Sequence, residues 1–208
     1  QKTRWLPQLA SGDMVAALAM TEPGTGSDLQ AVTTSAVKDG NHYRINGSKT
    51  FITNGQSADL ICLVAKTDKE QSARGVSLIM VETDGLEGFR RGRNLKKIGL
   101  KSQDTSELFF DNVKVPQTHL LGTEEGQGFY QLMKQLPWER LYIGITALGS
   151  MDCALEETTR YVQERKAFGQ RVMDFQNTRF KLAEIKTKIE VTRSFINDSI
   201  TRLEAGTL

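Results

Sequence analysis

Two short stretches of the chain place hydroxyl groups and backbone amides where a planar or anionic ligand could lie. Residues 14–20 form an apolar run, which we interpret as a buried strand. A turn with one proline and two glycines follows within residues 21–28. Thr21 stands at the end of the strand and Ser27 near the end of the turn. Such a turn can present N–H groups and hydroxyls to a ligand. Residues 49–55 repeat this form, with an aromatic residue and a threonine before Asn-Gly, and the repetition favours a shared site over two ordinary turns.

A different kind of chemistry is suggested by Glu139, in the sequence Leu-Pro-Trp-Glu-Arg-Leu. A carboxylate can act as a general base, and Trp138 and Leu141 could supply the apolar surroundings that suit this role. The spacing of the residues alone favours a surface glutamate, paired with a neighbouring cation, over a catalytic one.

Four longer motifs occur along the chain. They are Gly-Ser-Lys-Thr-Phe-Ile-Thr at residues 47–53, Lys-Ile-Gly-Leu-Lys-Ser at 97–102, Glu-Leu-Phe-Phe-Asp-Asn-Val-Lys-Val-Pro at 107–116 and Arg-Lys-Ala-Phe-Gly-Gln at 165–170. These motifs occur in the order, and with roughly the spacing, of the acyl-CoA dehydrogenase family, which the chain therefore closely resembles. Glu139 in its Glu-Arg-Leu context resembles the catalytic glutamate of the long-chain and isovaleryl branch. Family members are about twice as long, so the chain resembles the middle of one.

The resemblance implies roles for particular residues. Those expected to border the flavin ring of FAD are Leu18, Met20, Thr21, Gly26 and Ser27 on one strand, and Phe51, Ile52 and Thr53 on the other. Many family members have tryptophan where this chain has Phe51. Those expected to contact the FAD of a neighbouring subunit are Arg165, Phe168 and Gln176. Ser27 and Arg140 are expected to contact the acyl-CoA substrate, and Glu139 is the expected catalytic base.

The implied activity is FAD-dependent α,β-dehydrogenation of acyl-CoA thioesters to trans-2-enoyl-CoA. In the family the glutamate takes the α-proton while a hydride passes to flavin N5, and electrons then reach an electron-transferring flavoprotein. A full-length member is expected to form a homo-oligomer, either a dimer or a tetramer. Two alternatives remain open: an acyl-CoA oxidase on the same scaffold, and a binding module without turnover. The context of Glu139 favours long straight acyl chains, and branched ones remain possible.

The pattern along the chain predicts an α+β protein. Residues 1–121 read as a middle β-domain, an antiparallel sandwich or barrel, with the tail of a helix at residues 1–11. Short strands are expected at 32–37, 42–45, 49–53, 60–66, 76–81 and 107–110, separated by turns such as 38–41 and Asn46-Gly47. We see no alternating βαβ pattern, which argues against a Rossmann fold.

Residues 122–208 read as the first helices of an all-α bundle domain. Apolar residues recur at helical spacing from Gly128 onward. Pro137 is expected to kink the helix or begin its next segment. Asp174 is a plausible N-cap for the last helix, and Gly206 is its expected stop.

Composition narrows the possible classes of protein. The 208 residues carry a formal charge of +2, with 38% hydrophobic and 25% charged residues, a balance typical of soluble proteins and too weakly basic to indicate nucleic-acid binding. No run is apolar enough to span a membrane. Cys62 and Cys153 lie in apolar stretches, so we expect a reducing compartment, either a bacterial cytoplasm or a mitochondrial matrix. His42 and His119 are isolated, with no metal-ligand spacing. The basic run at 90–97 is expected to be a solvated face or loop rather than a phosphate site.

Overall fold

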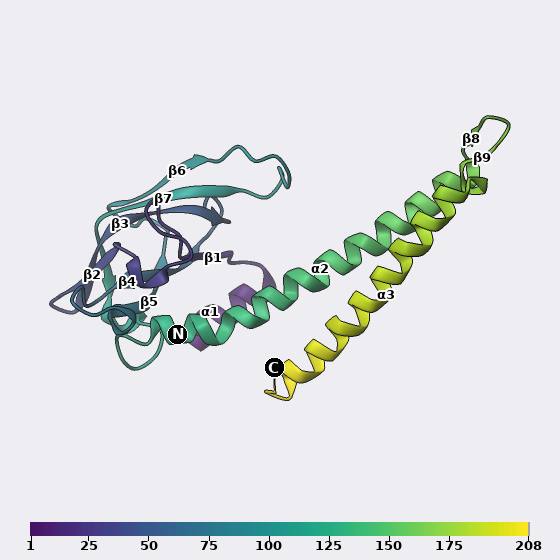
Figure 1. The fold of residues 1–208 in the computed structure, drawn as a ribbon. Helices are drawn as coiled ribbons and strands as arrows, with labels where there is room; N and C mark the ends of the chain where they lie inside the picture. The colour runs from purple at the N-terminus through teal and green to yellow at the C-terminus, as the bar shows by residue number, and fades with distance from the viewer. Residues whose placement is uncertain (208) are drawn as a thin grey trace. The chain divides into compact units, whose positions relative to one another are not determined.

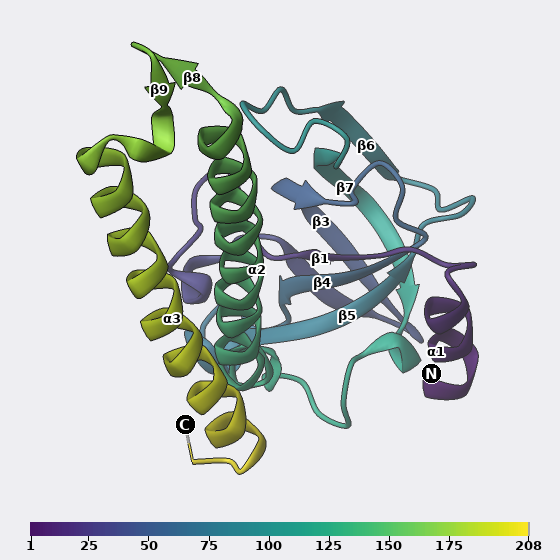
Figure 2. The ribbon, with the colours of Figure 1, turned by 90° about the vertical axis from the view of Figure 1, so that its right-hand side faces the viewer.

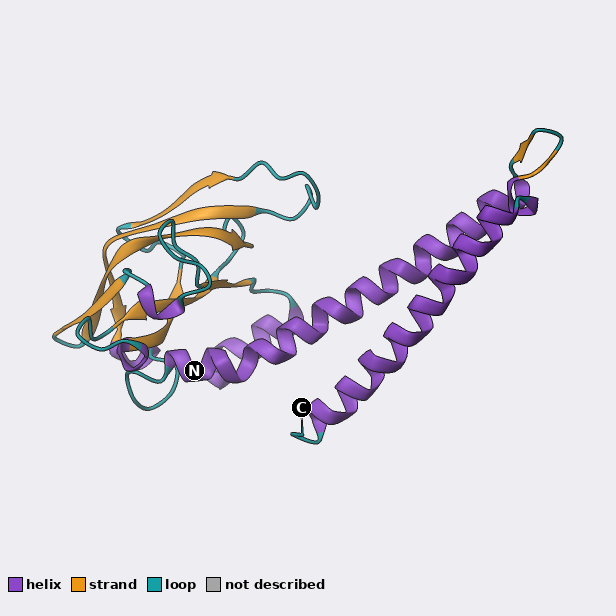
Figure 3. Cartoon of the chain, in the orientation of Figure 1, coloured by secondary structure: helices purple, strands orange, loops and turns teal. Residues whose placement is uncertain are grey.

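The computed structural model of the protein describes residues 1–207. They form two compact units, Gln1–Leu132 and Met133–Leu208. The first holds a sheet and the second is built almost entirely from helices, as Figure 3 shows by colour.

The first unit is organised around one curled seven-stranded sheet (Figure 1). Its strand order is β1-β4-β2-β3-β7-β6, and β5 pairs with β4. The strands are β1 (Ala16–Ala19), β2 (Ser35–Asp39), β3 (His42–Thr53), β4 (Leu60–Lys66), β5 (Val76–Glu82), β6 (Phe89–Asn94) and β7 (Thr105–Pro116). Most pairs are antiparallel, as expected, but β4 runs parallel to both β1 and β2. The α+β class with a β-domain ahead of helices is therefore confirmed, with a mixed sheet rather than a purely antiparallel one.

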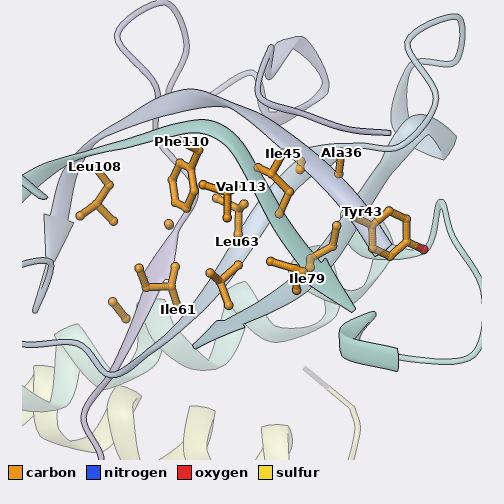
Figure 4. Close-up of a cluster of buried hydrophobic side chains, with 14 of the residues drawn as sticks. Ala36, Tyr43, Ile45, Ile61, Leu63, Ile79, Leu108, Phe110 and Val113 are labelled. Atoms are coloured by element: carbon orange, nitrogen blue, oxygen red, sulfur yellow. The ribbon is translucent and has the colours of Figure 1, made fainter. Parts of the chain in front are cut away.

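The apolar core lies inside the curl of this sheet, where side chains from most of its strands meet (Figure 4). Ile45, Ile61, Leu63, Ile79 and Val113 have no exposed surface. Burying one such side chain contributes about 1.5–3 kcal/mol, so this core is the main source of stability of the first unit.

Strand β3 corrects one expectation from the sequence. Asn46-Gly47 does not separate two strands, because β3 continues through it from His42 to Thr53. The pairing of β3 with β7 shifts between Ile45 and Gly47, so the dipeptide forms a bulge rather than a hairpin turn. Gly47 has φ +151°, and a Cβ there would lie 2.7 Å from the Cα of Thr34, which excludes any larger residue.

Strand β6 refines another. Of the basic run expected to be a solvated face or loop, residues 90–94 belong to an edge strand, on which Arg90 and Arg93 are exposed. The guanidinium of Arg90 lies over the ring of Phe109 at 4.1 Å, which is a cation–π arrangement. Arg91 donates to the carbonyl of Ala58 at 2.8 Å and to Oγ1 of Thr83 at 3.0 Å. These contacts give part of the basic run a structural role within the sheet.

The expected helix at the start of the chain is α1 (Lys2–Ser11), which ends at Gly12 with φ +83°. Trp5 is the buried residue of this helix, and its indole N–H donates to Glu82 at 2.7 Å. The short 3-10 helices are η1 (Leu29–Ala31), η2 (Ala73–Gly75), η3 (Gln117–His119) and η4 (Val172–Asp174).

The long helices are α2 (Gly128–Glu164) and α3 (Gln176–Glu204). Pro137 lies within α2 and does not end it. Asp174 is not the N-cap of α3, because Phe175 takes that position and Asp174 instead accepts from Arg171 at 2.9 Å. Gly206 follows the last turn of α3 with φ +68°, as expected for a helix stop.

Within the second unit, α2 and α3 lie side by side (Figure 2). Their contact is a narrow apolar cluster of Leu141, Leu148, Ile189 and Ile196. Arg193 on α3 also donates to Asp152 on α2 at 2.5 Å. Among residues 1–207, no helix has both the length and the apolar character needed to cross a membrane.

Candidate functional site

The structure brings together the two stretches that the sequence predicts to bind a ligand. The backbone N–H of Thr50 on β3 donates to the carbonyl of Thr21, just beyond the end of β1, at 2.9 Å. Farther along, the side-chain amide of Asn54 donates to the carbonyl of Ala16 at 3.0 Å. The expected flavin residues of the first unit therefore belong to two segments that are hydrogen-bonded to each other.

Phe51 is the most prominent side chain of this surface. It is 67% exposed, although it is a large aromatic residue on a strand. Its φ of +58° lies in the left-handed region, and the pairing of β3 with β7 shifts between Lys49 and Ile52. Such a backbone costs a non-glycine residue about 1–2 kcal/mol, and strain of this kind clusters at functional sites. The bulge turns the aromatic ring outward, where a planar ligand could stack on it.

Other predicted residues on these segments differ in exposure. Thr53, Gly26 and Ser27 are exposed, and Leu18, Met20 and Thr21 are partly buried. The side chain of Ile52 lies in the core with 2% exposed, so only its backbone is available to a ligand.

The turn itself fits a ligand that approaches the backbone. Glu22 and Thr25 exchange backbone hydrogen bonds of 2.9 and 3.2 Å, which closes the turn around Pro23 and Gly24. A Cβ at Gly24 would meet no atom within 4 Å, and one at Gly26 would meet only a methyl group of Thr21 at 3.9 Å. Packing therefore does not demand glycine at either position, and open space lies over the backbone where the flavin is expected.

Beneath this surface lies an ion pair that the sequence analysis missed. The ammonium of Lys49 lies 2.9 Å from a carboxylate oxygen of Glu22, and their side chains are 0% and 3% exposed. Burial alone would raise the pKa of Glu22, but the hydrogen bond from Thr33 and the Lys49 charge outweigh it and lower the pKa to about 2. Burial lowers the pKa of Lys49, and Glu22 opposes that shift. The two residues stand 27 positions apart, and no spacing rule connects them.

Glu139 lies on α2 in the second unit and is half-buried. It lines a shallow groove with Leu136, Trp138, Arg140 and Ile143, among others. Trp138 is 42% exposed and borders the groove, whereas Leu141 packs between α2 and α3. Of the two neighbours expected to make the surroundings of Glu139 apolar, only Trp138 lines this groove.

The three residues expected at a neighbouring subunit's FAD gather at the connection between α2 and α3. Arg165 follows α2, Phe168 sits in the turn of the hairpin formed by β8 (Lys166–Ala167) and β9 (Gln170–Arg171), and Gln176 begins α3. Phe168 is 96% exposed with φ +52°. Like Phe51, it is an aromatic ring held outward by a left-handed backbone.

The histidines and cysteines show no sign of metal binding. Nδ1 of His119 is 3.0 Å from the carbonyl of Met80, and its ring packs edge-on against Trp5. Cys62 and Cys153 are both free thiols. In the part of the chain that the structure describes, no group of three or more potential metal ligands occurs.

Comparison with known proteins assigns the chain and its fold to a family. The model of the acyl-CoA dehydrogenase middle domain matches residues 17–113, and that of the acyl-CoA dehydrogenase C-terminal domain matches residues 126–208. The chain belongs to the acyl-CoA dehydrogenase family, which confirms the resemblance seen in the motifs.

Individual relatives come from the expected branch. The chain is 50% identical to a mitochondrial long-chain specific acyl-CoA dehydrogenase of Sus scrofa over 202 residues, which cover 96% of this chain and 46% of the relative. It is 40% identical to a mitochondrial isovaleryl-CoA dehydrogenase of Pongo abelii, covering 99% and 49%.

A solved structure, an acyl-CoA dehydrogenase from Geobacillus kaustophilus, matches with a TM-score of 0.95 and 50% identity over 100% of this chain and 55% of that one. The chain spans about half the length of the curated relatives it matches.

Proposed function

We propose that the chain carries the flavin-binding segments and the catalytic base of an FAD-dependent acyl-CoA dehydrogenase, which converts acyl-CoA thioesters to trans-2-enoyl-CoA. The observation that carries the proposal is the outward-facing Phe51, held by a strained bulge beside the open turn at Gly24 and Gly26. Membership of the family and identity to relatives named acyl-CoA dehydrogenases support it.

In this proposal the first unit holds the flavin ring. Phe51 stacks against it, and Thr21, Ser27 and Thr53 offer hydroxyl and backbone groups to its polar edge. The ring, when bound, supplies the hydride acceptor that no amino-acid side chain can provide. Leu18, Met20, Gly26 and the backbone of Ile52 complete the contact.

The second unit supplies the base. The α-proton of a thioester is too weakly acidic for a carboxylate to remove unless donors polarise the carbonyl oxygen. Glu139 takes that proton, and its half-buried position beside Trp138 shields it in part from water. Arg140 lines the same groove and is proposed to contact the acyl-CoA. Ser27 is proposed to contact the acyl-CoA as well.

Arg165, Phe168 and Gln176 are proposed to hold the FAD of a neighbouring subunit. Their side chains are exposed at one helix connection, which supports this role. The proposal therefore includes a homo-oligomer, a dimer or a tetramer, at the full length of the relatives. It also includes an electron-transferring flavoprotein as acceptor, a preference for long straight acyl chains, and a bacterial cytoplasm or mitochondrial matrix as the compartment.

The test replaces the base in the protein at the length of its relatives. Glu139→Gln should lower kcat by about 10²–10⁴-fold, the usual contribution of a general base, and leave the flavin absorbance unchanged. Glu156→Gln, an exposed glutamate on the same helix, is the matched control and should keep full turnover. Undiminished turnover in Glu139→Gln would place the base elsewhere.

The same preparation discriminates the alternatives. A bound flavin that bleaches anaerobically with a long-chain acyl-CoA supports a dehydrogenase. Rapid oxygen consumption when the same acyl-CoA is added in air would indicate an oxidase, and a bound flavin that never bleaches would indicate a binding module.

A further inference from the structure

The Glu22–Lys49 pair has no part in the proposed reaction, although it is the most completely buried ion pair that the structure describes. The ammonium of Lys49 donates to Glu22 and also to the carbonyl of Met20, both at 2.9 Å. One lysine thus binds the side chain and the backbone of the first flavin stretch.

The carboxylate of Glu22 is equally well bonded. One of its oxygens accepts from the N–H and the hydroxyl of Thr33 at 2.7 and 2.6 Å. The other accepts from the N–H of Thr34 at 2.9 Å as well as from Lys49. Four donors from two other segments therefore converge on a carboxylate that sits inside the turn.

The position of the pair in the chain is as informative as its bonds. Met20 and Glu22 flank Thr21, whose carbonyl accepts from Thr50. Lys49 directly precedes Thr50 and Phe51, at the point where β3 leaves its register with β7. The ion pair therefore links the open turn to the strained bulge beside the hydrogen bond between Thr50 and Thr21.

We propose that Glu22 and Lys49 are positioning residues that hold the turn with Thr21 and Ser27 in fixed register with the bulge that presents Phe51. The inference rests on the proposed flavin site, since it concerns the geometry of that site. A buried ion pair is a poor way to gain stability, because the cost of desolvating two charges offsets their attraction. Its directional bonds do fix geometry, and a flavin needs both faces of its site held within fractions of an ångström.

The test separates positioning from stability with a neutral pair. The double variant Glu22→Gln/Lys49→Met removes both charges and keeps one oxygen, which can accept from Thr33, while the amide nitrogen replaces the oxygen that faces Thr34. Lys66→Met is the matched control, because Lys66 is also a buried lysine of the sheet that donates to backbone carbonyls, those of Gln71 and Ser72 at 2.7 and 2.6 Å. Both variants are made in the protein at the length of its relatives and loaded with FAD.

The double variant is expected to raise the FAD dissociation constant by at least about tenfold and to change the visible circular dichroism of the flavin that remains bound. Lys66→Met should lower the melting temperature without moving either flavin signal. A double variant that binds FAD with unchanged affinity and spectrum, while the parent also binds it, overturns this inference alone. A parent that binds no FAD overturns the proposed function as well.

The single variant Glu22→Gln keeps the result decisive if the double variant does not fold by far-UV circular dichroism. It is nearly isosteric and keeps the acceptor for the Thr33 hydroxyl, so an intermediate loss of FAD affinity is expected. Unchanged affinity in this folded variant would also overturn the inference.

Discussion

The two units of the chain differ in how far they bury their large apolar side chains. In the sheet, Ile45, Leu60 and Ile79 have no exposed surface. On the helices, Ile143 and Phe195 are 67% and 70% exposed. The difference shows that the sheet closes a core from its own residues, whereas the helix pair carries more apolar surface than two helices can bury. Large exposed apolar patches mark surfaces of interaction with other protein.

Core truncation should give the largest difference between the units. Ile61→Ala in β4 removes a fully buried side chain and should lower the free energy of unfolding by about 2–5 kcal/mol. Val191→Ala on α3, where the side chain is 66% exposed, should change it by no more than about 0.5 kcal/mol. Urea denaturation followed by circular dichroism measures both. An equal loss in the two variants would show that this face of α3 is packed against protein in solution.

The second largest difference between the units should be in how their stability depends on acidic pH. The pKa of Glu22 is lowered from 4.5 to about 2, so between these values the unfolded chain binds a proton at this residue and the folded chain does not. Stability from Glu22 is thus fully present above pH 4.5 and is lost as the pH falls toward 2, by up to about 1.4 kcal/mol per pH unit.

Urea titrations across this pH range measure the slope, and Glu22→Gln should reduce it by about one proton. On α3, Lys186 lowers the pKa of Glu190 through an exposed ion pair, so Glu190→Gln should leave the slope nearly unchanged. An unchanged slope in Glu22→Gln would contradict the buried-pair geometry.

A glycine substitution should give the smallest effect, but with opposite signs in the two units. Phe51→Gly relieves a left-handed backbone, so the gain should slightly exceed the entropy cost of glycine and stabilise the flavin-free protein by up to about 1 kcal/mol. Val191→Gly in the middle of α3 should destabilise by about 0.5 kcal/mol. Thermal melts report both, and a clear loss of stability in Phe51→Gly would mean that the Phe51 ring packs against the protein.

Local patterns predicted the elements but not the contacts between them. The short apolar runs of β4 and β5 and the helical spacing after Gly128 were sufficient to place those elements. Asn46-Gly47 has the composition of a hairpin turn, and its bulge depends on Thr34, which comes from another segment. The strand β6 was not predicted, because its sequence is highly charged. Part of its stability comes from a contact outside its own sequence, that of Arg90 with Phe109 of the neighbouring strand.

In the candidate site, too, single motifs could be predicted from the sequence but contacts between distant residues could not. Motifs in order predicted both flavin stretches, because each keeps its own sequence signature. Glu22 and Lys49 were missed as a pair, since their interaction exists only after β1 and β3 are brought together. Asp174 was assigned a capping role from its residue type, but Arg171 lies three positions earlier and takes its carboxylate.

The bulge in β3 also bears on how the protein ages chemically. Asn-Gly sequences lose ammonia when the glycine nitrogen attacks the asparagine side chain and closes a cyclic imide. Here the Asn46 carboxamide accepts from the backbone N–H of Asn112 at 2.9 Å, and the close approach of Gly47 to Thr34 holds the backbone in place. Deamidation at this dipeptide should therefore record how often β3 opens rather than how long the protein has been stored.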